Sequence, residues 1–256
     1  MPRWNRALVT GASSGIGAAI ARRLAADGTA LVVVARDRER LETLAADVAV
    51  DVEVLEADLS DPVDVARVAS RLRGDDAPID LLVNNAGLGF MGRFADADYE
   101  RERGVVAVNV LALHELSHAA AATMSAAGTG GILNVASVAG YLPSAGSATY
   151  AATKAFVNSF SESLHQELSD VGVVVTSSCP GFTKTEFQER ADYDSAQIPK
   201  LLWQDADTVA AHALAAVSDG KARAVPGFMN KVAVGFLKVA PLRLVRTFAR
   251  RTSDLD

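Results

Sequence analysis

Tyr150 and Lys154, in the run Y-A-A-T-K, are the residues whose types and spacing are best suited to moving a proton. Residues four positions apart share a face of a helix, so the lysine ammonium can lie near the phenol. A free tyrosine titrates at about 10, but a nearby positive charge lowers its pKa towards the range useful for general acid–base catalysis. Thr149 is expected to cap this helix. Taken alone, the spacing equally fits an aromatic residue and a lysine that only share a helix surface.

A glycine-rich segment, T-G-A-S-S-G-I-G, lies about 140 residues before this pair, between a strand pattern and a helix pattern. Gly11 suits a tight turn that a side chain would obstruct. Gly15 and Gly17 allow backbone N–H groups to approach a pyrophosphate, whose charge the helix N-terminus favours. Three glycines alone would also fit a loop that binds nothing, but the two motifs together predict a nicotinamide-dependent carbonyl reductase or alcohol dehydrogenase. The loop positions expected to contact the cofactor are Gly11, Ser13, Ser14, Gly15, Ile16 and Gly17.

The composition argues against several classes of protein. The chain has 256 residues, 50% of them hydrophobic, which suits one α/β domain with a sizeable core. A net charge of −6 and a pI of about 5.3 argue against nucleic acid as a main partner, because phosphate binding favours basic surfaces. The single cysteine, Cys179, leaves neither an internal disulfide nor a cysteine cluster for a metal. Because no signal-peptide core and no run of roughly 18 apolar residues is found, a soluble, cytoplasmic protein is expected.

Short apolar runs alternate with longer helix patterns along the chain. Runs such as L-V-V-V at 31–34 are apolar throughout, as expected of parallel strands that helices cover on both faces. The alternation predicts an α/β fold, a doubly wound, Rossmann-type parallel sheet of about seven strands in a single domain over residues 1–227. Strands are expected at 7–9, 30–35, 52–56, 81–84, 131–136, 173–178 and 223–225, and helices at 15–27, 38–49, 62–73, 98–127, 150–171 and 205–219.

Four further motifs follow one another along the chain. They are N-N-A-G at 84–87, Asn109 in a helix pattern, Ser137 in N-V-A-S-V, and Pro180-Gly181 followed by Thr183 and Thr185. Together with the glycine segment and Y-x-x-x-K, these six motifs resemble those of the short-chain dehydrogenase/reductase family in order and rough spacing. The glycine spacing T-G-x-x-x-G-x-G is the form seen in that family and differs from the G-x-G-x-x-G fingerprint. The resemblance covers most of the chain.

The resemblance implies a catalytic set of Asn109, Ser137, Tyr150 and Lys154. Ser137 would donate a hydrogen bond to the substrate oxygen, and Tyr150 would exchange a proton with that oxygen. Lys154 would tune the tyrosine and bind the nicotinamide ribose, while Asn109 would position a water in the proton relay. Taken singly, Ser137 fits a strand end and Asn109 a helix cap or kink; the joint pattern favours catalysis.

Further cofactor contacts are implied by the same resemblance. They are Asp58 and Leu59 at the adenine, Asn85, Ala86 and Gly87 beside the ribose, Pro180, Gly181 and Thr183 at the nicotinamide carboxamide, and Thr185 at the pyrophosphate. Asp58 would equally suit a turn or a helix cap.

The choice of cofactor depends on the end of the second strand pattern, V-V-V-A-R-D-R. An acidic residue there binds the ribose 2′-hydroxyl of NAD, whereas an arginine accommodates a 2′-phosphate. Arg36 occupies this place and Arg38 lies close by, which predicts NADP(H) in preference to NAD(H). If the strand ended one residue later, Asp37 would face the ribose and the protein would be an NAD-dependent alcohol dehydrogenase. A non-catalytic dinucleotide-binding regulator is a further alternative, but it has no chemical need for Tyr150 and Lys154 together.

The run H-E-L-S-H at 114–118 matches H-E-x-x-H, in which two histidines on one helix face bind zinc. A catalytic zinc needs a third protein ligand, and no downstream residue lies in a recognisable supporting motif. We therefore expect no metal site, and a zinc hydrolase remains the weakest alternative.

Large apolar side chains follow the segments that would line a substrate cavity, including a variable lid near 186–204. An apolar cavity with few polar groups suits a lipophilic ketone, aldehyde or secondary alcohol. The same residues would equally pack the lid against the sheet. They are Leu88, Phe90, Met91, Phe94, Tyr141, Leu142, Phe187, Tyr193, Ile198, Leu201, Leu202 and Trp203.

The C-terminal segment 228–256 is basic and amphipathic, with no acidic residue from 228 to 251 and a helix break expected at Pro241. Such a segment can lie on an anionic membrane, but we expect it to pack on the domain or on a subunit interface. A homodimer or homotetramer is predicted, and the segment puts the family's usual tetramer in doubt. Its basic residues are Lys231, Lys238, Arg243, Arg246, Arg250 and Arg251.

Overall fold

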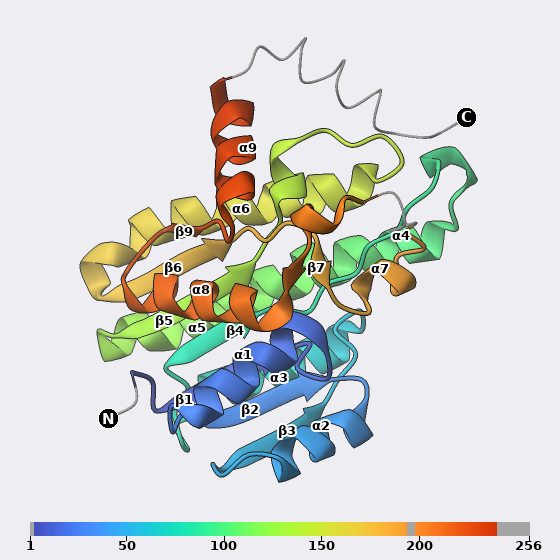
Figure 1. Ribbon diagram of the computed structural model, residues 1–256. Coiled ribbons are helices and arrows are strands. Elements are labelled where there is room, and N and C mark those ends of the chain that lie inside the picture. The colour runs from blue at the N-terminus through green and yellow to red at the C-terminus, as the bar shows by residue number, and fades with distance from the viewer. Residues whose placement is uncertain (1–2, 194–197, 240–256) are drawn as a thin grey trace.

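Seven parallel strands form one sheet in the computed structural model, which describes residues 3–193 and 198–239 (Figure 1). The strand order is β3-β2-β1-β4-β5-β6-β9, and neighbouring strands run parallel throughout. This order confirms the predicted doubly wound α/β sheet. The order reverses between β1 and β4, where such sheets have a ligand-binding crevice at the carboxyl ends of the strands. The strands are β1 (Arg6–Thr10), β2 (Ala30–Ala35), β3 (Val52–Glu56), β4 (Leu81–Asn84), β5 (Gly130–Val135), β6 (Val173–Ser178) and β9 (Arg223–Ala224).

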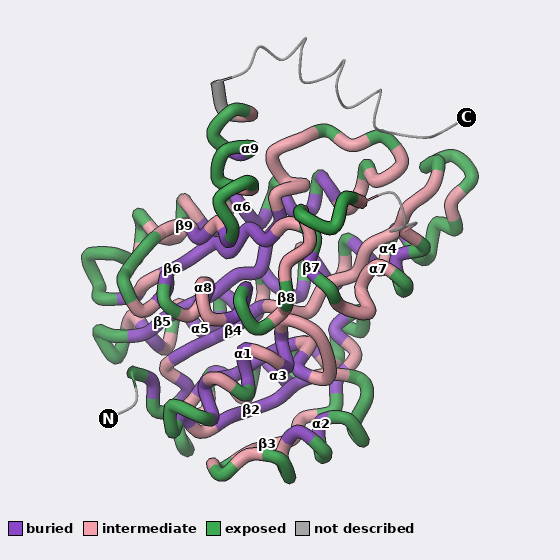
Figure 2. Tube along the Cα trace, viewed as in Figure 1, coloured by how far each residue is buried: buried purple, intermediate pink, exposed green. Residues whose placement is uncertain are grey.

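Helices cover both faces of the sheet, which explains why its strands are apolar throughout. Successive residues of a strand point to opposite faces, and in β1 Leu8 belongs to one core cluster while Val9 belongs to the other. Both faces are therefore shielded from water, and the central strands are buried in Figure 2. Helices α1 (Gly15–Ala26), α2 (Arg38–Ala46) and α8 (Ala206–Ser218) pack on one face, and α3 (Pro62–Arg73), α5 (Leu113–Ala127) and α6 (Ala148–Leu168) on the other.

The helix predicted over 98–127 consists of three consecutive segments. α4 (Tyr99–Val106) is followed by a π-helical stretch, η2 (Ala107–Ala112), and then by α5. Single π-helical turns are frequent at functional sites, and this one contains Asn109. By length and composition alone, the 29-residue run Tyr99–Ala127 would be long enough to cross a membrane, but half of its apolar window is buried in the domain, as in a core helix.

Helix α6 begins earlier than predicted. Its first residue is Ala148 and its N-cap is Ser147, so Thr149 lies inside the first turn and does not cap the helix. The expectation was wrong because a cap residue has a non-helical backbone, whereas the helical conformation here already starts before Thr149. At the other end, a 3₁₀ turn, η4 (Ser169–Val171), continues the helical stretch to the predicted boundary.

The segment 186–204, predicted to be a lid, starts and ends at a small two-stranded sheet. β7 (Thr183–Lys184) pairs in parallel with β8 (Gln204–Asp205), so the chain leaves and returns at one place. Strands of two residues show no periodicity, which is why the sequence did not predict this sheet. The shorter helices of the fold are α7 (Phe187–Arg190), η1 (Phe94–Asp96), η3 (Val138–Tyr141) and η5 (Lys200–Leu202).

Helix α9 (Phe228–Val239) is the described part of the C-terminal extension and projects from the domain (Figure 1). It contacts η3 and buries Val234, so it touches the domain along a narrow strip. Its exposed apolar side chains are Phe228, Met229, Val232 and Phe236. Other positions named for this extension, Pro241, Arg243, Arg246, Arg250 and Arg251, lie outside the described residues.

The glycine segment after β1 packs without room for a side chain at Gly17. A Cβ there would lie 2.3 Å from the carbonyl oxygen of Gly11 and 2.3 Å from Nδ2 of Asn85. The oxygen belongs to the backbone, which has no alternative rotamer, so the clash can be relieved only by moving the segment away from its neighbours.

We expect Gly17→Ala to lower the free energy of unfolding by about 1–3 kcal/mol, the usual cost of overpacking. Gly235→Ala is the matched control, because a Cβ at Gly235 in α9 meets nothing within 4 Å. That control should raise stability by about 0.5–1 kcal/mol, since alanine favours the helix. Urea unfolding of both variants measures the difference, and equal midpoints would contradict the proposed clash.

Candidate active site

The carboxyl ends of β1 and β4 are joined by hydrogen bonds at the point where the strand order reverses. Nδ2 of Asn85 donates to the carbonyl oxygens of Thr10 and Gly11 at 2.9 and 3.2 Å. The Thr10 hydroxyl oxygen accepts from the backbone N–H groups of Asn85 and Ala86, both at 3.0 Å. The sequence did not predict a role for Thr10, although its place beside Gly11 in T-G was the signal. These bonds fix the glycine segment against N-N-A-G.

The first turn of α1 is suited to binding an anion. Its N-cap, Ser14, makes no capping hydrogen bond through its side chain, and no acidic residue lies in the first turn. The N-terminal N–H groups and their partial positive charge are therefore left for a ligand. By contrast, α2, α3, α4 and α8 are each capped by an aspartate carboxylate, namely Asp37, Asp61, Asp98 and Asp205. Ser13, Ser14 and Ile16, all partly exposed, line the loop together with Gly11 and Gly15, whose φ angles are +66° and +57°. This arrangement fits a pyrophosphate.

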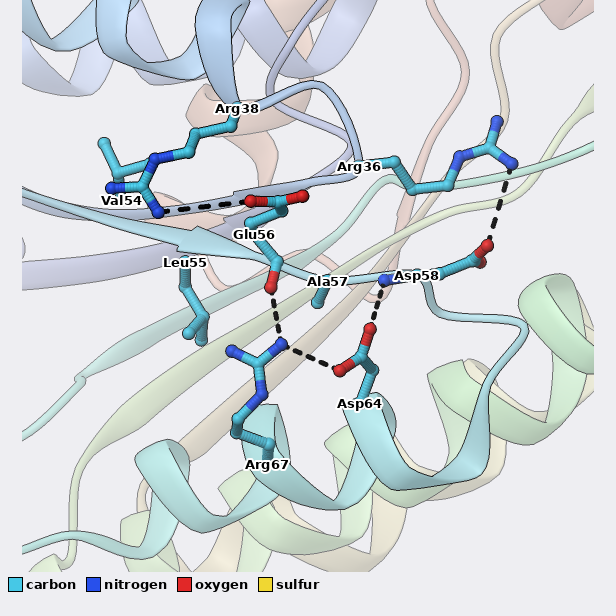
Figure 3. A pocket seen from close by; sticks show the side chains of 9 residues that line it. All are labelled: Arg36, Arg38, Val54, Leu55, Glu56, Ala57, Asp58, Asp64 and Arg67. Atoms are coloured by element: carbon cyan, nitrogen blue, oxygen red, sulfur yellow. Dashed lines mark hydrogen bonds and ion pairs between the residues drawn. The ribbon is translucent and has the colours of Figure 1, made fainter.

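Three arginines, Arg36, Arg38 and Arg67, lie with Asp58 around a cavity beside the end of β2 (Figure 3). The Arg36 side chain is 63% exposed, and its Nη1 lies 3.8 Å from the Asp58 carboxylate. Asp58 also accepts from the N–H and hydroxyl of Ser60 at 2.9 and 2.7 Å, so it serves as a turn residue too. Asp37, the alternative ligand for the ribose, caps α2: its carboxylate accepts from Arg40 N at 3.1 Å. Leu59, expected beside the adenine, is buried in the core.

Asn109, in the π-helical stretch, holds the loop after β4. Its Oδ1 accepts from Leu88 N at 2.8 Å, and its Nδ2 donates to Leu88 O at 2.8 Å and to Thr153 Oγ1 at 3.0 Å. Thr153 in turn donates to Tyr150 O at 2.7 Å. The buried side-chain amide of Asn109 therefore links helix α6, through Thr153, to Leu88, the residue after N-N-A-G. Thr153 lies within Y-A-A-T-K, so its type and position were visible in the sequence.

Ser137 lies beside α6 because the turn η3 packs closely on that helix. A Cβ on Gly140 would lie 2.6 Å from the backbone carbonyl carbon and oxygen of Lys154, a contact that only glycine allows. The Ser137 hydroxyl accepts from Ala139 N at 3.1 Å. The structure thus brings together the residues expected to handle the proton.

Lys154 is buried, with only 5% of its surface exposed, and its Nζ donates to the carbonyl oxygen of Val135 at 2.8 Å. Nζ lies 5.8 Å from the centroid of the Tyr150 ring. Burial lowers the pKa of Lys154 from 10.5 to about 8. Burial also raises the pKa of Tyr150, and the hydrogen bond with Ser137 acts in the opposite direction. The expectation of a lowered tyrosine pKa is therefore wrong, because removing the phenolate from water outweighs the hydrogen bond with Ser137.

The segment from Pro180 to Thr185 lies between the turn η3, which follows Ser137, and the glycine segment. Val138 N donates to Pro180 O at 3.0 Å, and Thr183 Oγ1 donates to Gly181 O at 3.1 Å. Cγ2 of Thr185 packs on the glycine segment, 2.9 Å from where a Cβ on Gly15 would lie. Gly181 lies against helix α9, where its Cβ would be 2.5 Å from Nδ2 of Asn230. The expected nicotinamide and pyrophosphate contacts therefore share one edge of the sheet with the glycine segment.

A row of buried polar side chains crosses three strands below this edge. Asn84, Asn134 and Ser177 are paired in register on β4, β5 and β6. Nδ2 of Asn84 donates to Oδ1 of Asn134 at 2.9 Å, and Nδ2 of Asn134 donates to Ser161 Oγ at 3.0 Å. The network ties the strands to α6, because buried polar groups need partners. Sequence analysis did not single out this row, although a polar residue near the end of each apolar run was a visible signal.

The H-E-x-x-H residues do not assemble a metal site. His114 and His118 are exposed on α5, and the His114 ring lies 5.4 Å from the ring of Phe160. Within residues 3–193 and 198–239, no group of three or more His, Cys, Asp or Glu residues is arranged to hold a metal ion.

The fold and this edge of the sheet together define a dinucleotide-binding oxidoreductase. The family model described as short chain dehydrogenase matches residues 5–196, and the chain belongs to the short-chain dehydrogenase/reductase family. It is an enzyme that acts on CH–OH groups with a nicotinamide cofactor.

Three similar proteins illustrate the range of this family. Sulfoacetaldehyde reductase 2 from Chromohalobacter salexigens is 39% identical over 70% of this chain and 73% of its own length. The structure of a short-chain dehydrogenase from Sphingobium yanoikuyae in complex with NADPH is 37% identical, with a TM-score of 0.82 over 94% of this chain and 97% of its own. The bulky-bulky ketone specific alcohol dehydrogenase from Comamonas testosteroni is 32% identical, with a TM-score of 0.78 over 93% and 95%.

Because the buried ammonium is costly, we expect Lys154→Met to raise the free energy of unfolding at pH 7. The lowered pKa of Lys154 means that keeping the ammonium charged costs the folded state roughly 3 kcal/mol at pH 7. Losing the hydrogen bond to Val135 O would offset about 1 kcal/mol of the gain in the variant. The lysine loses its proton at about pH 8 in the folded state and at about pH 10.5 in the unfolded state. The free energy of unfolding of the wild type therefore rises between these two pH values. The difference in stability between wild type and Lys154→Met narrows over the same range.

Urea unfolding from about pH 7 to about pH 10 measures this gap. Lys200→Met, at an exposed lysine, is the control and should change stability little at any pH. A Lys154→Met protein that is less stable than wild type at pH 7 would show that the ammonium is not strained by burial.

Proposed function

We propose that the protein is an NADP(H)-dependent oxidoreductase that transfers a hydride between nicotinamide and a lipophilic carbonyl or secondary alcohol substrate. The observation that carries the proposal is the convergence of Ser137, Tyr150 and Lys154 with the glycine segment at one sheet edge. A pyrophosphate site and a proton-transfer group within one crevice are what hydride transfer to a carbonyl requires. The glycines and the uncapped α1 fit the cofactor.

Bound nicotinamide supplies or accepts the hydride, and the side chains manage the substrate oxygen and its proton. Ser137 donates a hydrogen bond that stabilises the developing charge on that oxygen. Tyr150 gives its phenolic proton to the oxygen during reduction and removes it during oxidation. Lys154 orients the tyrosine and binds the nicotinamide ribose, and Asn109 positions a water for the proton relay. The raised pKa keeps the Tyr150 phenol protonated at neutral pH, as a proton donor must be, but it also makes the phenol a weaker acid.

The preference for NADP(H) is supported by the charges at the end of β2. Arg36 is largely exposed and lies beside the cavity of Figure 3, where its guanidinium can form paired hydrogen bonds with a 2′-phosphate. Asp37, which would bind the ribose of NAD, is engaged by the backbone of α2 and by the Arg40 side chain. The Sphingobium relative was solved with NADPH. A Brucella melitensis reductase of the same fold was solved with NADH, so an NAD-dependent enzyme is the second candidate.

The proposed substrate class rests on the aromatic lining of the lid. The Phe182 ring lies 5.9 Å from Tyr193 and 6.0 Å from Trp203, and Phe187 lies 5.5 Å from Tyr150. Aromatic walls favour an apolar molecule beside the reacting oxygen. The Comamonas relative, which is specific for ketones with two bulky groups, is consistent with this choice.

We propose that the C-terminal extension packs on the domain or on a second subunit, and that the enzyme is a cytoplasmic homodimer or homotetramer. The buried Val234 and the hydrogen bonds from Asn230 to Gln204 and Pro226 support packing at its start. Its exposed apolar and basic face leaves peripheral membrane contact as a weaker proposal. A non-catalytic regulator is disfavoured because the full proton-transfer set is present.

We expect Tyr150→Phe to bind NADPH normally and to lose turnover by about 10²–10⁴-fold, because the proton donor is gone while the cofactor contacts remain. Binding is followed by NADPH fluorescence, and turnover by NADPH oxidation with carbonyl compounds of graded size. Tyr99→Phe, at a tyrosine that is 70% exposed, is the control and should keep wild-type turnover. Retained activity in Tyr150→Phe would exclude this mechanism.

We expect Arg36→Asp to weaken NADPH binding by about ten- to a hundredfold and to leave NADH binding almost unchanged, because a charged hydrogen bond to the 2′-phosphate is lost. Parallel fluorescence titrations of wild type and variant with both cofactors measure this. Arg22→Asp, at an exposed arginine of α1, controls for the change in net charge. Tighter binding of NADH than NADPH by the wild type would favour the NAD-dependent alternative and make Asp37 the ribose ligand.

A further inference from the structure

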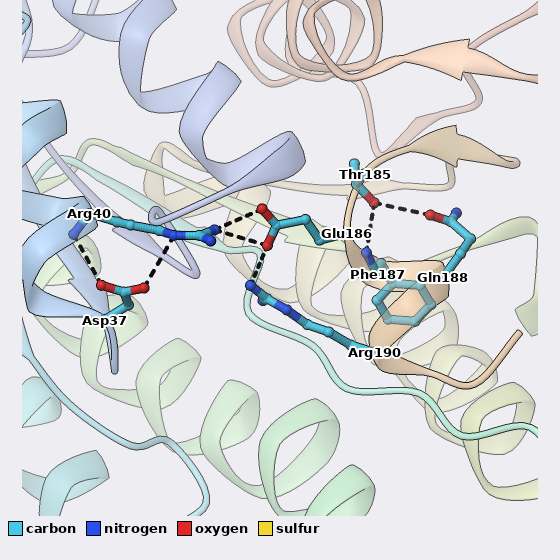
Figure 4. Close-up of polar contacts among 7 residues, drawn as sticks. All are labelled: Asp37, Arg40, Thr185, Glu186, Phe187, Gln188 and Arg190. Carbon is cyan, nitrogen blue, oxygen red and sulfur yellow. Dashed lines mark hydrogen bonds and ion pairs between the residues drawn. The ribbon is translucent and has the colours of Figure 1, made fainter.

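An ion pair joins helix α2 to the start of the lid (Figure 4). Nη1 of Arg40 donates to both carboxylate oxygens of Glu186, at 2.8 and 2.9 Å, although the two residues lie 146 positions apart. Nε of Arg40 lies 3.2 Å from Asp37, and Glu186 also accepts from Arg190. Four charges of alternating sign therefore form one network from the N-cap of α2 to helix α7.

The two ends of this network lie on opposite sides of the glycine segment. Arg40 follows β2, whereas Glu186 follows β6 and β7, and β1 lies between β2 and β6 in the sheet. Thr185, directly before Glu186, packs on the glycine segment at Gly15. The ion pair thus links the chain on the two sides of the segment that fits a pyrophosphate.

The residue after Glu186 reaches the candidate catalytic tyrosine. The Phe187 ring lies 5.5 Å from that of Tyr150, and its Cζ is 2.6 Å from where a Cβ on Gly89 would lie. Beyond α7, Asp192 accepts from Arg101 of α4 at 2.7 Å. These two ion pairs hold α7 from different sides. The pair with Arg40 comes from helix α2, which follows β2, and the pair with Arg101 comes from α4.

We propose that Arg40 and Glu186 are positioning residues whose ion pair latches the lid across the cofactor crevice. The inference rests on the proposed function, because it requires a nicotinamide cofactor in that crevice. A cofactor held between the glycine segment and Thr185 can leave only when the lid lifts, and the lid can lift only when the ion pair opens. The same pair keeps Phe187 against Tyr150 while the cofactor is bound.

The strength of the pair suits a latch that opens in each catalytic cycle. Its side chains are 47% and 42% exposed, so water and salt screen their attraction. Nη1 of Arg40 nevertheless contacts both oxygens of the carboxylate, and Nε of Arg40 lies 3.2 Å from Asp37, so two carboxylates hold the guanidinium. Lid opening and product release limit the turnover of many enzymes, so a weak latch changes exchange rates more than equilibrium affinity.

The test is the rate at which NADPH leaves the full-length enzyme when excess NADP⁺ displaces it, followed by stopped-flow fluorescence. Arg40→Gln and Glu186→Gln should each raise this rate about three- to fivefold, the scale of an exposed ion pair. The double variant should match either single variant, because the same interaction is removed. Raising salt from about 0.05 to about 0.5 M should speed release from the wild type and not from the variants. Arg40→Lys keeps the charge but has one nitrogen in place of the separate Nη1 and Nε contacts, and it should release NADPH at a rate between those of wild type and Arg40→Gln.

The ion pair between Arg23 of α1 and Asp207 of α8 provides the matched control. It also has two hydrogen bonds, at 2.6 and 2.5 Å, and is exposed, but it lies in neither the crevice nor the lid. Asp207→Asn should leave NADPH release unchanged, which separates loss of the latch from a general loss of stability.

Three results would overturn the latch. Release rates equal to wild type in both single variants, or additive effects in the double variant, would show that the pair does not hold the lid. Weaker NADPH affinity in Arg40→Gln together with tighter affinity in Glu186→Gln would make Arg40 a phosphate ligand that Glu186 restrains. A wild-type protein that binds neither NADPH nor NADH would overturn the proposed function, and the latch with it.

Discussion

The side-chain amide of Asn85 joins the two halves of the sheet where the strand order reverses. It donates to two backbone carbonyls of the glycine segment, and Gly17 is close enough that a methyl group would displace it. Parallel strands bring their carboxyl ends to one edge, and this contact then holds the loops of β1 and β4 at a fixed separation. The first turn of α1, which is suited to an anion, and the loop that Asn109 holds both adjoin this contact.

A second constraint is the cost of burying polar groups close to the site. Lys154 is almost wholly buried and its pKa falls, while the pKa of Tyr150 rises, so both residues are driven towards their neutral forms. The row that starts at Asn84 avoids such a cost because each amide has a partner. The satisfied network therefore contributes to stability, whereas burial disfavours the charged forms of Tyr150 and Lys154. Such a cost is expected where function requires it.

The fold and the site residues could be predicted from the sequence to different degrees. Strands covered on both faces are apolar throughout, and glycines mark close approaches, so both features are local and visible. The π-helical stretch around Asn109 and the early start of α6 were missed because tertiary hydrogen bonds and packing decide them. The direction of the tyrosine pKa was wrong because burial depends on the whole fold. The ion pair of Arg40 with Glu186 joins distant parts of the chain, and no local pattern indicates it.

The three arginines that follow β2 each already face a carboxylate. Arg36 lies near Asp58, Arg38 pairs with Glu42, and Arg40 pairs with Glu186. A phosphate entering this rim must compete with the carboxylate that already faces the guanidinium it approaches. The acidic partners therefore lower the positive charge of the rim and oppose a further negative charge there. One of these partners, Glu186, directly follows Thr185, which packs on Gly15, so the rim is joined to the glycine segment.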